Sequence, residues 1–103
     1  MAFNAYDASS REARLRRADA GDYIKRLRTD SEMTQRQLAD KLNLEYYTFI
    51  SQMECGQGRL PPKLWADTAI ALNQDPKEFG LRMLSYYDPY AYECITKGTN
   101  KNE

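Results

Sequence analysis

Histidine is absent from this chain of 103 residues, and cysteine occurs only twice. Cys55 and Cys94 lie far apart and form no CxxC motif, so the sequence lacks the ligands of a zinc site and the parts of a Cys-His nucleophile. It also has no clustered carboxylates and no phosphate-binding glycine loop. We therefore predict no catalytic residue, no metal and no cofactor, and an enzyme is the least favoured class.

The sequence also lacks a long apolar run, a signal peptide and a net charge. The first two absences predict a cytoplasmic protein with no membrane partner. Fifteen Lys and Arg residues balance fifteen Asp and Glu residues, which is unusual for a strong nucleic-acid binder. The basic residues nevertheless gather near the front, where one side of the protein could approach DNA: Arg11, Arg14, Arg16, Arg17, Lys25, Arg26 and Arg28.

Two short helices are predicted within residues 34–56, TQRQLADKLNLEYYTFISQMECG. Thr34 and Gln37 form a capping box, which marks the start of the first helix. Apolar residues then recur at helical spacing, and an asparagine follows that tolerates a left-handed turn. These residues are Leu38, Ala39, Leu42 and Asn43.

The second helix is predicted from about Glu45 to Glu54, and Gly56 supplies its C-terminal cap. At roughly 100° per residue, Tyr46, Ile50 and Met53 should point inward, with Tyr47 on their flank. Thr48, Ser51 and Gln52 should point outward, where Gln can bond adenine and a Thr methyl can touch thymine. Two helices arranged in this way are typical of a helix-turn-helix that presents its second helix to a DNA groove.

The stretch from about residue 22 to residue 79 resembles the phage-repressor and Cro-like helix-turn-helix family, often called the XRE family. The resemblance covers a little over half of the chain. The matching segments are Leu27-Arg28, Met33-Thr34-Gln35, Leu38-Ala39-Asp40-Lys41-Leu42 and Ile50-Ser51-Gln52-Met53-Glu54 with Gly56. The resemblance implies an all-α fold, a compact five-helix bundle of the lambda-repressor-like type, whose third helix reads the groove.

The resemblance also implies roles for individual residues. Base contacts are expected from the third helix, at Tyr47, Thr48, Ser51 and Gln52. Phosphate contacts are expected from the second helix and from the loop after the third, at Gln35, Arg36, Arg59 and Lys63. Arg28 and Glu54 match a partly buried ion pair that ties the first helix to the third.

One departure from the family concerns the start of the third helix. Between Leu38 and Ile50 the chain carries one residue more than the family pattern. The extra residue lengthens either the turn or the first turn of the helix. Which of Glu45, Tyr46 and Tyr47 faces DNA therefore stays open.

Three regions are predicted along the chain. Residues 1–20 form a basic arm or a helical extension, because Ser9 with Glu12 signals a helix start and Gly21-Asp22 could interrupt it. Residues 21–85 form the DNA-binding domain, in which Pro61-Pro62 starts the fourth helix. Asp75 caps the fifth helix, with Glu78 at its third position.

Residues 86–103 form the third region, an aromatic segment followed by a disordered tail from residue 96. Asp88-Pro89 should break the fifth helix, after which the chain folds back or crosses to a partner. Tyrosine is favoured in interfaces, so we predict a homodimer contact here. The alternative is a tail that packs on its own domain. The expected contact residues are Leu84, Tyr86, Tyr87, Tyr90 and Tyr92.

The sequence thus favours a dimeric, sequence-specific transcriptional regulator that binds a near-palindromic operator in double-stranded DNA. A protein-interaction role is the alternative, in which the chain is an antitoxin that binds a toxin, or a regulator that binds RNA polymerase. The zero net charge and the tyrosine-rich end keep this alternative open. The two roles are compatible with each other.

Overall fold

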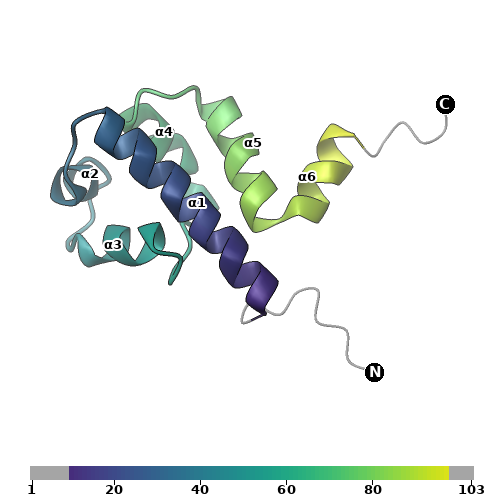
Figure 1. Cartoon of the computed structure of the whole chain (residues 1–103). Coiled ribbons are helices and arrows are strands. Elements are labelled where there is room, and N and C mark those ends of the chain that lie inside the picture. The colour runs from purple at the N-terminus through teal and green to yellow at the C-terminus, as the bar shows by residue number, and fades with distance from the viewer. Residues whose placement is uncertain (1–9, 98–103) are drawn as a thin grey trace.

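The structure of the protein is a computed structural model that describes residues 10–97. This part of the chain contains six α-helices and one 3-10 helix but no strand, which confirms the all-α prediction (Figure 1). The elements are α1 Arg11–Asp30, α2 Gln35–Lys41, α3 Thr48–Glu54, η1 Pro62–Leu64, α4 Trp65–Ala71, α5 Pro76–Tyr87 and α6 Pro89–Thr96.

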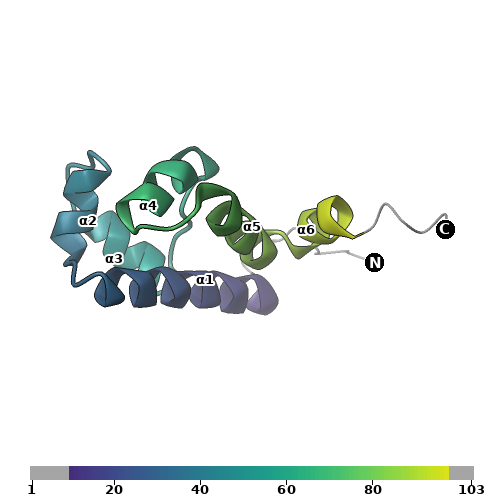
Figure 2. The same ribbon diagram turned by 90° about the horizontal axis from the view of Figure 1, so that it is seen from above.

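Helix α1 is the long helix against which α3 and α5 pack (Figures 1 and 2). Ser10 caps it by accepting a hydrogen bond from the Ala13 amide, whereas the sequence suggested Ser9, which lies outside the described residues. The helix runs through Gly21 and Asp22 without a break. Residues 11–20 are therefore a helical extension continuous with α1, and the rest of the 1–20 region lies outside the described residues.

Helix α2 begins as predicted, because both hydrogen bonds of the Thr34–Gln37 capping box are present. The helix ends at Lys41, and Asn43 in the turn that follows has a left-handed backbone with a φ of 60°. Helix α3 begins at Thr48, three residues later than the predicted Glu45. Tyr46 therefore belongs to the connection and is 66% exposed, so the expectation that it points inward was wrong. Residues 42–47 form the connection between α2 and α3.

A single apolar core lies between α1, α2, α3, α4 and α5. Its members are fully or almost fully buried, and polar residues occupy the opposite faces of the same helices. The core residues are Ala20, Ile24, Leu38, Ala39, Leu42, Ile50, Met53, Leu60, Ala69, Leu72, Phe79 and Met83. A short helix of seven residues such as α3 is marginal by itself, so this packing fixes its position.

The C-terminal half follows the predicted breaks with one adjustment. The helix expected after Pro61-Pro62 starts as the 3-10 turn η1 and becomes α-helical at Trp65. Asp75 caps α5 through the Glu78 amide, as predicted.

Asp88 ends α5 and caps α6 through the Ala91 amide. Helix α6 packs beside α5 at one end of the molecule (Figure 2). It extends to Thr96, so residue 96 is helical and not part of the expected tail; residues 98–103 of that tail lie outside the described residues. Within residues 10–97, none of the helices is both long enough and apolar enough to span a membrane.

Candidate nucleic-acid interface

Helix α3 has two chemically different sides. Ile50 and Met53 point into the core and are fully buried. Thr48 and Gln52 are exposed on the other side, and Ser51 is partly exposed between them. The outward side therefore carries hydroxyl and amide groups without a charge, supported by a fixed apolar base.

Two glycines let α3 approach α1 closely at its C-terminal end. A Cβ atom on Gly21 would lie 2.4 Å from the carbonyl oxygens of both Met53 and Glu54. Gly56 has a φ of +85°, and a Cβ atom there would lie 2.9 Å from the Cα of Ala18. Only glycine fits such contacts without displacement of backbone, so this crossing sets the position of α3 against α1.

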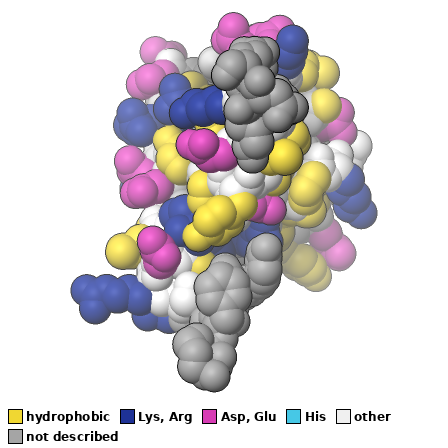
Figure 3. Space-filling model, turned by 90° about the vertical axis from the view of Figure 1, so that its right-hand side faces the viewer, with side chains coloured by type: hydrophobic (Ala, Val, Ile, Leu, Met, Phe, Trp, Pro, Cys, Tyr) yellow, Lys and Arg dark blue, Asp and Glu magenta, His cyan; other side chains and the backbone are white. Residues whose placement is uncertain are grey.

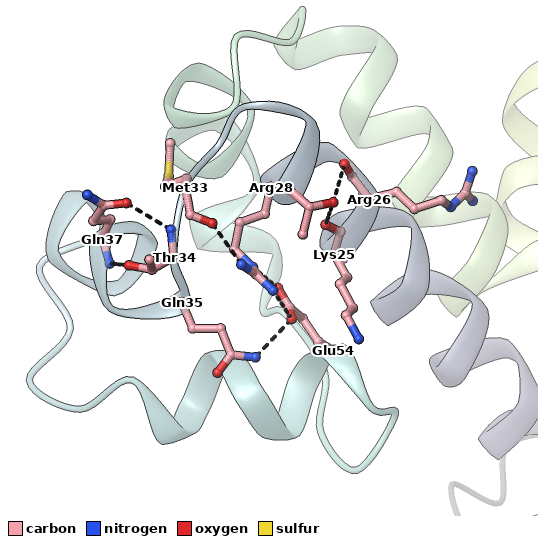
Figure 4. Close-up of polar contacts among 9 residues, drawn as sticks. Lys25, Arg26, Arg28, Met33, Thr34, Gln35, Gln37 and Glu54 are labelled. Carbon is pink, nitrogen blue, oxygen red and sulfur yellow. Dashed lines mark hydrogen bonds and ion pairs between the residues drawn. The ribbon is translucent and has the colours of Figure 1, made fainter.

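A buried polar network connects α1, α2 and α3 (Figure 4). The Arg28 guanidinium forms a bidentate ion pair with the Glu54 carboxylate, with N–O distances of 2.7 and 3.0 Å. It also donates to the Met33 carbonyl at 2.7 Å. Both charged residues are only 7% exposed, so their pairing in place of water is required for stability.

Gln35, expected to contact phosphate, is the fourth member of this network. Its Nε2 donates to Glu54 Oε1 at 3.0 Å, and its side chain is partly buried. The interaction holds the start of α2 against the end of α3. The Gln35 amide is thus oriented by Glu54 instead of extending freely into solvent (Figure 4).

Arg36 and Tyr47 come together at the opposite end of α3. The Arg36 guanidinium lies 5.3 Å from the centroid of the Tyr47 ring, within the range of a cation–π contact. Both side chains are exposed, and with Thr34 and Gln35 they line a shallow depression between α2 and α3. Tyr47, the last residue before α3, therefore lies at the surface next to a basic side chain.

The other two expected phosphate contacts follow α3 in the chain. Arg59 is exposed, and its guanidinium lies 4.6 Å from the centroid of the Tyr87 ring. Lys63 is exposed on η1. Arg17 of α1, which the sequence placed only among the basic residues near the front, donates from Nε to the Gly56 carbonyl at 3.3 Å. No local motif marks Arg17, because the contact joins residues far apart in sequence.

The aromatic end combines internal packing with exposed surface. Tyr87 contacts its own domain, since its hydroxyl accepts the Leu60 N–H at 2.9 Å and its ring lies against Trp65. Burial raises the pKa of Tyr87, while the Leu60 N–H and the charges of Arg59 and Arg17 act in the opposite direction. Tyr86 lies against Tyr23.

The other side chains of the aromatic end range from partly buried to exposed. Leu84 and Tyr92 are partly buried, whereas Tyr90 is 57% exposed and Ile95 is 65% exposed. Figure 3 views this end and shows hydrophobic side chains interspersed with basic and acidic ones. The expected dimer residues are thus divided between contacts within the domain and open surface.

The described residues hold no group of three or more His, Cys, Asp or Glu side chains that could bind a metal ion. Cys55 and Cys94 are both exposed and unpaired with each other. The chain matches no family model, no curated protein and no solved structure. Helices α2 and α3 with the surrounding basic side chains are therefore the candidate interface.

Proposed function

We propose that this protein is a sequence-specific, DNA-binding transcriptional regulator, with α2 and α3 as a helix-turn-helix of the lambda-repressor-like type. The supporting observation is the division of α3 into a buried apolar side and an exposed polar one. Ile50 and Met53 anchor the helix, which leaves Thr48 and Gln52 at the surface. A recognition helix needs this arrangement, because base edges must be reached by side chains on a fixed backbone.

The exposed side chains suit direct contacts with bases. Gln52 can donate to N7 and accept from N6 of adenine, while the Thr48 methyl can contact the methyl of thymine. Ser51 can act as donor or acceptor, and Tyr47 extends the same surface at the start of the helix. We therefore expect the operator half-site to contain A·T pairs where Gln52 and Thr48 enter the major groove.

Basic side chains at both ends of α3 are suited to positioning it on the duplex. Arg36 lies at one end, and Arg59 and Lys63 follow the other end. Phosphate contacts of this kind fix register without reading sequence. Because they are local, they can act in a chain whose formal net charge is zero.

The protein acts as a homodimer in this proposal. A two-fold axis would present two α3 helices to successive turns of the major groove, about 34 Å apart, and the operator would be near-palindromic. The exposed Tyr90 and Ile95 of α6 also support a second candidate function, in which this surface binds a protein partner such as a toxin or RNA polymerase.

Selection from a pool of random DNA duplexes with the purified full chain tests the proposal. Enrichment of a sequence with two inverted half-sites is expected. A pool that stays random after several rounds at low salt would overturn the proposed regulator. Gel filtration of the chain with a candidate partner then tests the second function, and a stable complex without any duplex binding would favour that function instead.

A further inference from the structure

The strongest feature beyond the expected contacts is a pair of arginines at the C-terminal end of α3. One of them, Arg17, comes from α1, and the other, Arg59, comes from the loop after α3. In Figure 1, α3, this loop and the first turns of α1 together form the lower edge of the molecule. The two arginines thus lie at the same end of the proposed recognition helix.

Separate contacts hold each guanidinium in place. Arg17 is fixed to the loop, because its Nε donates to the Gly56 carbonyl at 3.3 Å. The left-handed Gly56, packed against Ala18, brings that carbonyl up to α1. Arg59 rests on the face of Tyr87, which in turn binds the loop through the Leu60 N–H. A side chain that is already ordered loses less entropy when it binds a ligand.

The two arginines contact the same short loop after α3: Arg17 binds it at Gly56, and Arg59 belongs to it and lies on Tyr87, which binds the neighbouring Leu60 N–H. Both charges also lower the pKa of Tyr87, against the effect of burial. Arg59 has no carboxylate partner among residues 10–97. Two like charges held close together attract an anion more strongly than either does alone, and guanidinium groups match phosphate in geometry.

We propose that Arg17 and Arg59 form a phosphate-binding site for the DNA backbone, through which α1 contacts the duplex beside α3. This inference rests on the proposed function. It adds α1 to the interface and gives the helical extension at residues 11–20 a role in binding. Since phosphate carries no sequence information, the site strengthens binding to all duplexes alike.

Arg17→Ala tests the site, with Arg26→Ala as a matched control. Arg26 lies nine residues further along α1, on the opposite face of the helix, and forms only an exposed pair with Asp22. Affinity for an enriched duplex and for a random duplex is measured by fluorescence anisotropy between 50 and 200 mM salt. Arg17→Lys keeps the charge and separates a phosphate contact from a structural role.

Loss of one phosphate contact should reduce the slope of log affinity against log salt by about 0.9. Over this fourfold salt range, the affinity of the wild-type chain should therefore fall about 3.5-fold more than that of Arg17→Ala. Arg59→Ala should reduce the slope by the same amount, whereas Arg17→Lys and Arg26→Ala should keep the wild-type slope. Thermal melting shows whether each variant is folded.

An Arg17→Ala slope equal to that of the wild type would overturn the site, even if affinity falls. A loss of affinity confined to the enriched duplex would also overturn it, because it would indicate a base contact. Both results leave the proposed regulator standing. If the wild-type chain binds no duplex at 50 mM salt, the proposed function fails first, and the phosphate site fails with it.

Discussion

Glu54→Ala should destabilise the protein severely, because it leaves the charge of Arg28 buried without its main partner. Arg28 and Glu54 are each 7% exposed and share two hydrogen bonds. Removal of one member of a buried ion pair costs about 3–5 kcal/mol of folding free energy. The Gln35 amide also loses its acceptor, so the start of α2 is no longer tied to α3.

Urea unfolding followed by circular dichroism measures this loss. For small domains the free energy of unfolding falls by about 1–3 kcal/mol per M urea, so the midpoint should drop by about 1 M or more. Glu93→Ala is the control, since the Glu93–Lys97 pair on α6 is exposed and joins residues four apart. Such exposed helical pairs contribute about 0.3–0.5 kcal/mol.

A double variant, Arg28→Met with Glu54→Leu, removes both buried charges together. It should be more stable than Glu54→Ala, because no charge is then left without a partner. If Glu54→Ala loses no more stability than Glu93→Ala, the network does not hold the three helices together as described.

Three further predictions concern the crossing of α1 with α3 and the aromatic end. Gly21→Ala should lower the free energy of unfolding in urea by about 1–3 kcal/mol, because the new methyl group meets backbone oxygens of α3. In Gly58→Ala the methyl group enters open space, so this control should lose little stability. Tyr87→Phe should lower the free energy of unfolding by about 1–3 kcal/mol, because it removes the acceptor of the buried Leu60 N–H. Tyr90→Phe, on the exposed surface, should not. Equal losses in the two variants would contradict the internal role of Tyr87. Burial raises the pKa of Tyr87 above its ordinary value of 10.0. The stabilisation from the neutral Tyr87 side chain should therefore be complete below pH 10.0 and should be lost as the pH rises through the raised pKa. In Tyr87→Phe, the free energy of unfolding should fall less over the same alkaline range.

The local features of the fold were predictable from the sequence because neighbouring residues carry them. The Thr34–Gln37 box and the cap that Asp75 forms with the Glu78 amide each join residues three apart, and both form as predicted. The apolar residues Leu38, Ala39 and Leu42 likewise recur at helical spacing, and all three are buried.

The start of α3 was not predictable in the same way. Glu45 and Tyr46 fit a helical pattern, but the structure places them in the connection between α2 and α3. Periodicity alone does not distinguish the first turn of a short helix from the last residues of a turn. The expected burial of Tyr46 failed for this reason.

Contacts between distant parts of the chain were also hidden in the sequence. The Arg17–Gly56 hydrogen bond and the close approach of Gly21 to Met53 depend on how α1 crosses α3. A sequence without aligned relatives contains no signal for such pairs. The ion pair of Arg28 with Glu54 was expected only through the family resemblance.

The base preference of Gln52→Ala shows whether the outward side of α3 reads DNA sequence. Binding of the wild-type chain and of this variant is measured on the enriched operator and on duplexes with each single base pair changed. The variant should lose about 1–3 kcal/mol on the operator and should no longer discriminate at one position of each half-site. If the affinity for every duplex falls by the same factor, or if no affinity falls, the outward side of α3 does not read bases.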